Sequence, residues 1–454
     1  MTTPSQRTGT RCLRWLLAIA AAGLVTAGAV RAQESLKQDD KNKLDQFRAG
    51  TPDKATPEMK EVCDKVARWY AARLVDQKVR ENAEGMGESR LVNLLAQQLG
   101  LLPHTGDRAA TNEYVRNPQR HPFIDEFGKS LITALEAPAL QVGNPIVQVN
   151  ANRLIAEVCR AGYDGAAEVC LKVLAKPDAD EAGKHYALAA KFYALQGLKN
   201  LFAIFPNPTT RDDPGIPEKT VFQKDNTGTL SPLELRCIRA LIDFIFRQPT
   251  GELTPQDVDV HFYLRREAVR ALAWVRVQQA KDKGKVVSRP AYELLRVARG
   301  DGLNPPSMTP QGADPRAAGE RLEATIGFCS LVPPRTDRDM NIDYGVYHIG
   351  RALQELAPLY RYNARDTSTP WKAEALWIRD ALTTWKTRAN EMKLQDAKLI
   401  GELFDIVDRD ILKPIEDAKE DARPDATNLD QWLKANQPKS PSLFKNEPKT
   451  TIKP

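Results

Sequence analysis

The clearest structural signal in the chain is the stretch Leu-Arg-Arg-Glu-Ala-Val-Arg-Ala-Leu-Ala-Trp-Val, which forms residues 264–275. Apolar or small residues recur there at Leu264, Ala268, Leu272 and Val275, with spacings of 4, 4 and 3. Residues at these spacings share one face of an α-helix, so the stretch predicts an amphipathic helix with one buried side. The small side chain of Ala268 would let a partner helix approach closely.

The same spacing recurs in three other segments. Their members are Val147, Ala151, Ile155 and Val158; Ala190, Ala194, Leu198 and Leu201; and Gly345, Ile349, Leu353 and Leu356. Ala151 and Ala194 are 43 residues apart, and the next two steps are close to twice that length. Such recurrence is typical of stacked helical hairpins, because one hairpin cannot bury its apolar stripe alone. The predicted repeat core consists of Val147, Ala151, Ile155, Ala194, Leu198, Leu264, Ala268, Leu272, Ile349 and Leu353.

Residues 144–158 resemble the second helix of a HEAT repeat, which follows the pattern Pro-x-Val-Arg-x-x-Ala-x-x-Ala-Leu-Gly-x-Ile. Four residues match the pattern, and two differ, because Gln148 replaces the arginine and Leu154 replaces an alanine. The four matches are Pro145, Val147, Ala151 and Val158. Residues 264–275 match more closely, with Arg265 in the arginine position. A looser copy is formed by Lys191, Ala194, Gly197, Leu198 and Leu201.

This resemblance covers roughly residues 121–360. It implies an all-α, HEAT- or armadillo-like α-solenoid with irregular Pro- and Gly-rich insertions, and such stacks serve mainly as binding scaffolds. Tyr163-Asp164-Gly165 predicts a turn, which would make residues 144–175 one helical hairpin. Aromatic residues are expected to fill gaps between the helices, namely Trp69, Tyr193, Phe202, Trp274 and Trp377.

The first 32 residues have the features of an export signal. An arginine-bearing start is followed by residues 15–30, which carry no charge, and then by Arg31 and Ala32. Val30 and Ala32 suit the −3 and −1 positions of a signal peptidase site, so we expect cleavage between Ala32 and Gln33. The uncharged stretch is short for a membrane span of roughly 20 residues, although an uncleaved anchor is the alternative.

The charge of the chain does not indicate a nucleic-acid partner. The formal net charge is +6, but residues 1–32 contribute four arginines and no acid, so the remainder carries only +2. The remaining chain is predicted to contain a polar spacer at 33–55, a helical-repeat domain at 56–420 and a disordered tail at 421–454. No stable membrane span is expected once the leader is removed.

Five cysteines remain after the predicted cleavage, so at least one thiol is left unpaired: Cys63, Cys159, Cys170, Cys237 and Cys329. Each lies among apolar, helix-forming residues, which favours buried thiols that act as small apolar side chains. The alternative is a Cys159–Cys170 bridge across a short helical hairpin.

No catalytic, cofactor-binding or metal-ligating motif is found, and no cofactor is expected. The histidines are far apart along the chain, without the spacing of a zinc site. Residues 223–234 match a calcium loop at Gly228 and Glu234 but have Asp225 as the only early carboxylate. We favour instead a helix that is capped by Ser231 and has Pro232 at its first position.

These features predict an exported, non-enzymatic helical-repeat scaffold that binds another protein in a bacterial periplasm or cell envelope. A simple export signal, few cysteines and no Asn-x-Ser/Thr glycosylation site favour a bacterial envelope. Two alternatives stay open: an α/α-toroid carbohydrate-active enzyme, whose carboxylates would meet only in space, and a structural protein of the envelope.

Overall fold

The computed structural model describes the chain in segments that begin at residue 37. The described residues are 37–50, 54–75, 87–100, 122–141, 144–177, 188–203, 230–248, 255–275, 277–282, 285–303, 306, 308–309, 312–313, 317–331, 340–363, 371–391, 393–394, 396–417 and 423–445. The predicted cleavage site at Ala32 and Gln33 and most of the possible calcium loop lie outside them.

The structure divides into two compact units. Unit 1 comprises Met1–Val173 and Ala179–Tyr193, and unit 2 comprises Leu174–Asp178 and Ala194–Pro454. Helix α9 (Ala166–Ala175) and helix α10 (Leu188–Ala203) each contribute residues to both units. The single helical domain predicted over residues 56–420 therefore consists of two separately packed parts.

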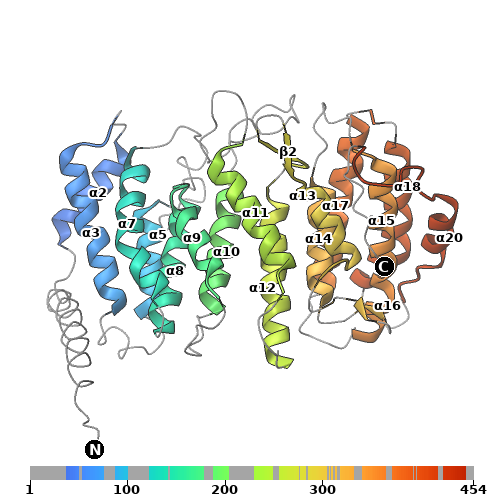
Figure 1. Ribbon diagram of the computed structural model, residues 1–454, viewed down its shortest axis with the longest axis horizontal. Coiled ribbons are helices and arrows are strands. Elements are labelled where there is room, and N and C mark those ends of the chain that lie inside the picture. Colours follow the sequence, from blue (N-terminus) through green and yellow to red (C-terminus); the bar gives the residue numbers. More distant parts are fainter. Residues whose placement is uncertain are drawn as a thin grey trace, which may run out of the picture. The chain divides into compact units, whose positions relative to one another are not determined.

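In unit 1, the described segments are helical (Figure 1). The helices are α2 (Gln38–Ala49), α3 (Pro57–Val75), α5 (Gly87–Gln98), α7 (Pro122–Leu140), α8 (Pro145–Arg160) and the first parts of α9 and α10. Helix α3 packs against α7, α7 packs against α8, and α5 also contacts α8. Helix α2 lies against α3 and α7.

The prediction of a polar spacer at 33–55 is wrong where α2 forms. Leu44 is buried, and the Lys65 ammonium lies 2.8 Å from the Asp40 carboxylate. The Arg48 guanidinium donates a hydrogen bond of 2.6 Å to the carbonyl of Gln97. One buried leucine and polar bonds to other helices hold this helix, so its composition alone did not reveal it.

The helical hairpin predicted over residues 144–175 is confirmed. The side chain of Asn144 accepts a hydrogen bond from the backbone N–H of Val147, and Pro145 occupies the first turn of α8. The chain reverses between α8 and α9, where Gly162 has a φ of 94° that a glycine adopts without strain.

Unit 2 is also helical, with two short β-hairpins among the described residues. Its helices are α11 (Pro232–Phe246), α12 (Pro255–Ala273), α13 (Pro290–Arg299), α14 (Ala318–Ser330), α15 (Ile342–Gln354), α16 (Leu356–Asn363), α17 (Trp371–Glu391), α18 (Ala397–Val407), α19 (Lys413–Asp417) and α20 (Thr427–Ala435), with a π-helical turn at Asp408–Leu412. The antiparallel strands are β1 (Ala280–Asp282) with β2 (Lys285–Ser288), and β3 (Met308–Thr309) with β4 (Gly312–Ala313). The all-α prediction is confirmed for the described chain.

The predicted start of α11 is confirmed as well. The Ser231 hydroxyl accepts a hydrogen bond of 3.0 Å from the backbone N–H of Glu234, and Pro232 begins the helix. A serine cap followed by proline is a local signal, so it is visible without knowledge of the tertiary fold.

Helices α12, α14 and α17 lie side by side in one layer of unit 2 and run in the same direction (Figure 1). Arg265 of α12 pairs with Glu320 of α14, and further along both helices Ala273 lies against Gly327. Helix α13 packs against both α12 and α14 from a second layer, where it also contacts α11 and α15. This arrangement of alternating helices is compatible with a helical repeat fold.

The prediction of a disordered tail at 421–454 is wrong for residues 423–445. Helix α20 packs against α15 and α18, and Leu443 and Phe444 are buried. The backbone N–H of Asn341 donates a hydrogen bond of 2.7 Å to the carbonyl of Leu443. The segment has few apolar residues, but Leu429, Leu433, Leu443 and Phe444 are all buried.

All ten residues of the predicted repeat core are buried, with at most 2% of any of them exposed. Two of the aromatic residues expected in gaps between helices lie at the surface instead. Trp274 is 37% exposed and Trp377 is 46% exposed. No helix among the described residues is both long and apolar enough to span a membrane.

Candidate functional site

The candidate site is a face of unit 2 formed by α12, α14 and α17, and we call it the α12–α14–α17 face. Tyr263 of α12 and Trp274, which directly follows this helix, are about three helical turns apart and therefore lie on the same side. Trp377 and Arg388 have the same separation on α17. The face is defined by Tyr263, Glu267 and Arg270 of α12 and Trp274 directly after it; Glu323, Ile326 and Ser330 of α14; and Trp377, Thr384 and Arg388 of α17.

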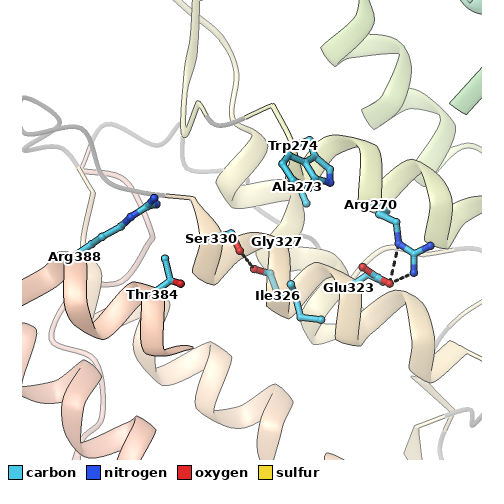
Figure 2. Close-up of a pocket in the computed structure, with 9 residues that line it drawn as sticks. All are labelled: Arg270, Ala273, Trp274, Glu323, Ile326, Gly327, Ser330, Thr384 and Arg388. Atoms are coloured by element: carbon cyan, nitrogen blue, oxygen red, sulfur yellow. Dashed lines mark hydrogen bonds and ion pairs between the residues drawn. The ribbon is translucent and has the colours of Figure 1, made fainter. Parts of the chain in front are cut away.

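A cavity of about 260 Å³ opens within this face, near the C-terminal ends of α12 and α14 (Figure 2). Arg388 and Thr384 stand on one side of it, and Trp274 and Ala273 stand on the other. The remaining lining residues are Arg270, Glu323, Ile326, Gly327 and Ser330. The lining thus combines an indole and aliphatic groups with a few polar side chains, as binding pockets commonly do.

Gly327 allows α12 and α14 to approach each other at the floor of this cavity. A Cβ atom added at Gly327 would lie 2.5 Å from the Cβ atom of Ala273 and 3.3 Å from its Cα atom. Real Cβ atoms do not come that close, so the two helices require a glycine here.

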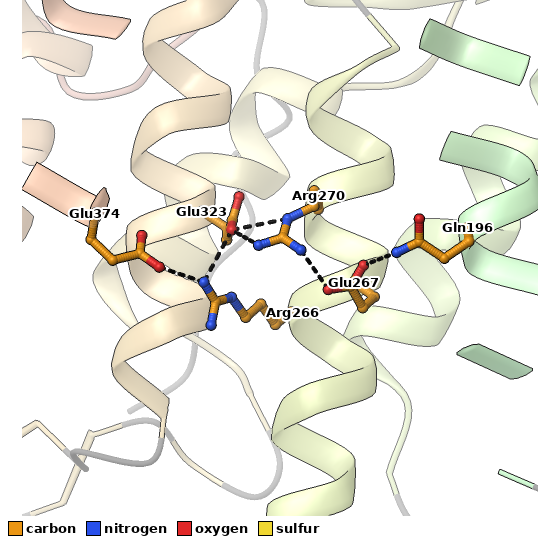
Figure 3. A network of polar contacts seen from close by, with 6 residues as sticks. All are labelled: Gln196, Arg266, Glu267, Arg270, Glu323 and Glu374. Carbon is orange, nitrogen blue, oxygen red and sulfur yellow. Dashed lines mark hydrogen bonds and ion pairs between the residues drawn. The ribbon is translucent and has the colours of Figure 1, made fainter. Parts of the chain in front are cut away.

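A network of ion pairs crosses the same three helices (Figure 3). The Arg266 guanidinium lies 2.5 Å from Glu374 and 3.2 Å from Glu323. The Arg270 guanidinium bonds to Glu323 and, at 2.7 Å, to Glu267. Gln196 of α10 donates a hydrogen bond to the Glu267 carboxylate. The network therefore joins α10, α12, α14 and α17.

Burial changes the acidity of two carboxylates in this network. Desolvation raises the pKa of Glu374, against the opposing effect of Arg266. Desolvation also raises the pKa of Glu267, although Arg270 and Lys199 act to lower it. The Oε2 atom of Glu374 is buried, and no described residue donates a hydrogen bond to it, which agrees with a disfavoured charge.

Arg388 differs from the other two arginines of the site. Burial lowers its pKa, and Glu391 on the same helix opposes that effect. Among the described residues, none forms an ion pair or hydrogen bond with its guanidinium, whereas Arg266 and Arg270 each contact two carboxylates. Arg388 is therefore the cation of this face with the greatest capacity for a further partner.

The chemistry of the face suits binding. Glu323 is held by Arg266 and Arg270, and the Ser330 hydroxyl donates a hydrogen bond of 2.8 Å to the carbonyl of Ile326. No pair of nucleophile and general base is assembled by the residues that line the cavity. Within the described segments, no group of three or more histidine, cysteine, aspartate or glutamate side chains is placed to hold a metal ion.

None of the sequence-predicted core residues lines the cavity. Leu264, Ala268 and Leu272 occupy the buried side of α12. The exposed aromatic residues were missed as candidates. The signal that could have found them is the stripe of Tyr263, Glu267, Arg270 and Trp274, in which two charged residues stand between two aromatic residues at helical spacing.

Comparison with known proteins identifies no relative: no family model, curated protein or solved structure matches the chain.

Proposed function

We propose that the chain is an exported, non-enzymatic scaffold with HEAT- or armadillo-like repeats, which binds another protein in the periplasm or cell envelope. The observation that carries the proposal is the presence of exposed aromatic side chains on one layer of packed helices. Tyr263, Trp274 and Trp377 are 52%, 37% and 46% exposed, respectively.

Exposed tryptophan and tyrosine residues next to arginine are the side chains that most often dominate the binding energy of protein interfaces. On the α12–α14–α17 face they stand on a rigid base, because ion pairs and the Gly327 contact fix the helices below them. A rigid aromatic surface loses little conformational entropy when a partner binds. These properties support a binding role.

The proposal is tested by capture of partners from the native envelope with tagged wild-type protein and with the double variant Trp274→Ala/Trp377→Ala. We expect the variant to lose the specific partner by about tenfold or more, as for truncation of interface hot spots. The matched control is Ile146→Ala, because Ile146 is also apolar and is 50% exposed on α8. Equal capture by all three folded proteins would contradict the proposal for this face.

Export is tested separately by the intact mass of the protein purified from its native cells. We expect the mature chain to begin at Gln33. Protein that retains residues 1–32 would contradict cleavage and favour an anchored protein.

A further inference from the structure

Two cysteine side chains meet between the helices of the hairpin in unit 1. Cys159 lies near the end of α8 and Cys170 lies within α9, and their Sγ atoms are 3.9 Å apart. Both residues are fully buried, and no disulfide joins them in the structure. At a separation of 3.9 Å the two sulfur atoms are in contact but are not covalently bonded.

The hairpin holds the two thiols opposite each other. The backbone N–H of Tyr163 bonds to the carbonyl of Val158, and the N–H of Ala166 bonds to the carbonyl of Tyr163. The ring of Tyr163 fills the space beside Gly128 of α7 and Gly165, where added Cβ atoms would lie 2.5 and 2.6 Å from it. The hydrogen bonds of the turn and the packing of the Tyr163 ring against Gly128 and Gly165 therefore fix the direction in which α9 follows α8.

We infer that Cys159 and Cys170 become joined by a disulfide when the chain folds in an oxidising compartment. A disulfide has an S–S distance of about 2.05 Å, so forming the bond requires the sulfurs to approach by about 2 Å through side-chain rotation or small helix shifts. In the cell this inference rests on the proposed export, because reducing compartments keep such thiols reduced.

The oxidant is a small-molecule disulfide or a thiol–disulfide oxidoreductase. One cysteine thiolate attacks the oxidant's disulfide, which forms a mixed disulfide and releases one thiol. The second thiolate then attacks the mixed disulfide, forms the Cys159–Cys170 bond and releases the second thiol. The protein loses two electrons and two protons, and the oxidant is reduced to two thiols. Because both sulfurs are buried in the folded chain, the exchange takes place while the hairpin is still accessible.

Two other thiols of the chain are poorly suited to thiol–disulfide exchange once the chain has folded. Burial raises the pKa of Cys63 to about 12, and Glu126 and Asp64 add to that effect. Burial also raises the pKa of Cys329. The thiolate is the reactive form, so these two residues persist as thiols at neutral pH.

The experiment refolds the full chain in a buffer of oxidised and reduced glutathione and then alkylates it in denaturant without a reductant. We expect peptides containing Cys159 and Cys170 to be recovered joined, with a mass about 2 Da below the sum of the two thiol peptides. Alkylation of both residues after refolding, or a different pairing, would overturn the inference. Because the oxidant is supplied, this result does not depend on where the protein resides.

A second measurement compares thermal unfolding with and without dithiothreitol. Reduction should lower the melting temperature of the wild type by about 5 °C or more, since the bond restrains the unfolded chain. The variant Cys159→Ala/Cys170→Ala should show no such response, whereas Cys63→Ala should respond like the wild type. Equal responses of wild type and double variant would overturn the inference.

Discussion

Gly327 is the residue at which α14 comes closest to α12, and it gives the sharpest prediction for a single side chain. We expect Gly327→Ala to lower the free energy of unfolding by about 1–3 kcal/mol, the usual cost of overpacking a close contact. The reason is the added Cβ atom, which would lie 2.5 Å from the Cβ atom of Ala273 and 3.4 Å from a methyl group of Leu294. Denaturant unfolding measures the change.

The matched control is Gly319→Ala, eight residues earlier on the same helix. There the added Cβ atom would meet the side chain of Arg266, with the Nη1 atom at 2.9 Å, and a long side chain moves aside more readily than a backbone. Gly319→Ala should therefore cost less than Gly327→Ala. The reverse order would show that the close contact between α12 and α14 is elsewhere.

The raised pKa of Glu374 predicts an effect of pH on stability. A carboxyl group whose pKa is higher in the folded than in the unfolded chain binds a proton more readily when folded, so its contribution to stability falls as the pH rises through that range. Glu374→Gln stays neutral, so the stability of this variant relative to the wild type should rise from about pH 4 to pH 8. Melting temperatures across this range measure the difference.

The control for this prediction is Glu61→Gln, at an exposed position on α3. The melting temperature of this variant should change with pH in the same way as that of the wild type. If the melting temperature of the Glu374→Gln variant also follows that of the wild type across the pH range, then burial does not disfavour the charge of Glu374.

For single residues, the sequence predicted features that depend on neighbours along the chain and missed contacts between residues far apart in the sequence. The Ser231 cap and the buried stripe through Ala268 follow from residues three or four positions apart. The Arg266–Glu374 pair joins residues 108 positions apart, and no periodicity in either helix reveals it. The exposure of Trp377 likewise depends on which side of α17 the neighbouring helices cover.

Among the elements, the C-terminal segment gives the clearest prediction. Phe444 is 1% exposed and pairs with Met340 in a β-bridge just before α15. Phe444→Ala should lower the free energy of unfolding by about 3–5 kcal/mol, as truncation of a buried aromatic ring does. Hydrogen exchange at the Asn341 amide, which bonds to Leu443, should become faster.

Lys445→Ala is the control, because Lys445 is the exposed neighbour of Phe444. It should change stability by no more than about 0.5 kcal/mol. Unchanged exchange at Asn341 in the Phe444→Ala variant would show that the segment is not held by this ring.

Helices with a broad apolar stripe were predictable, whereas α2 and α20 were not. Helix α20 buries Leu429 and Leu433 among otherwise polar residues, and α2 buries Leu44 in the same way. A short polar segment with so few apolar residues has the composition of disordered chain. Its partners, α15 and α18 for α20, belong to parts of the sequence that composition cannot associate with it.

For the whole molecule, the division into two units determines how damage in one region spreads. In a stack of repeats each element contacts mainly its neighbours, so the effect of a substitution stays near its own interface. Unit 1 and unit 2 have separate cores, and Ala268 lies in the core of unit 2. A substitution there should therefore affect one unit more than the other.

Ala268→Leu tests this expectation and the phase of the predicted repeat together. Ala268 is fully buried, so a larger side chain has no space and should cost about 1–3 kcal/mol. Unfolding should become broader or biphasic, and residues 121–205 should keep their protection from hydrogen exchange longer than residues 260–280. Lys281→Leu, at an exposed position of β1, should stay within about 0.5 kcal/mol of the wild type.

A neutral Ala268→Leu beside a damaging Lys281→Leu would mean that the stripe through residue 268 does not face a neighbouring helix. The HEAT-like interpretation would then have to be abandoned.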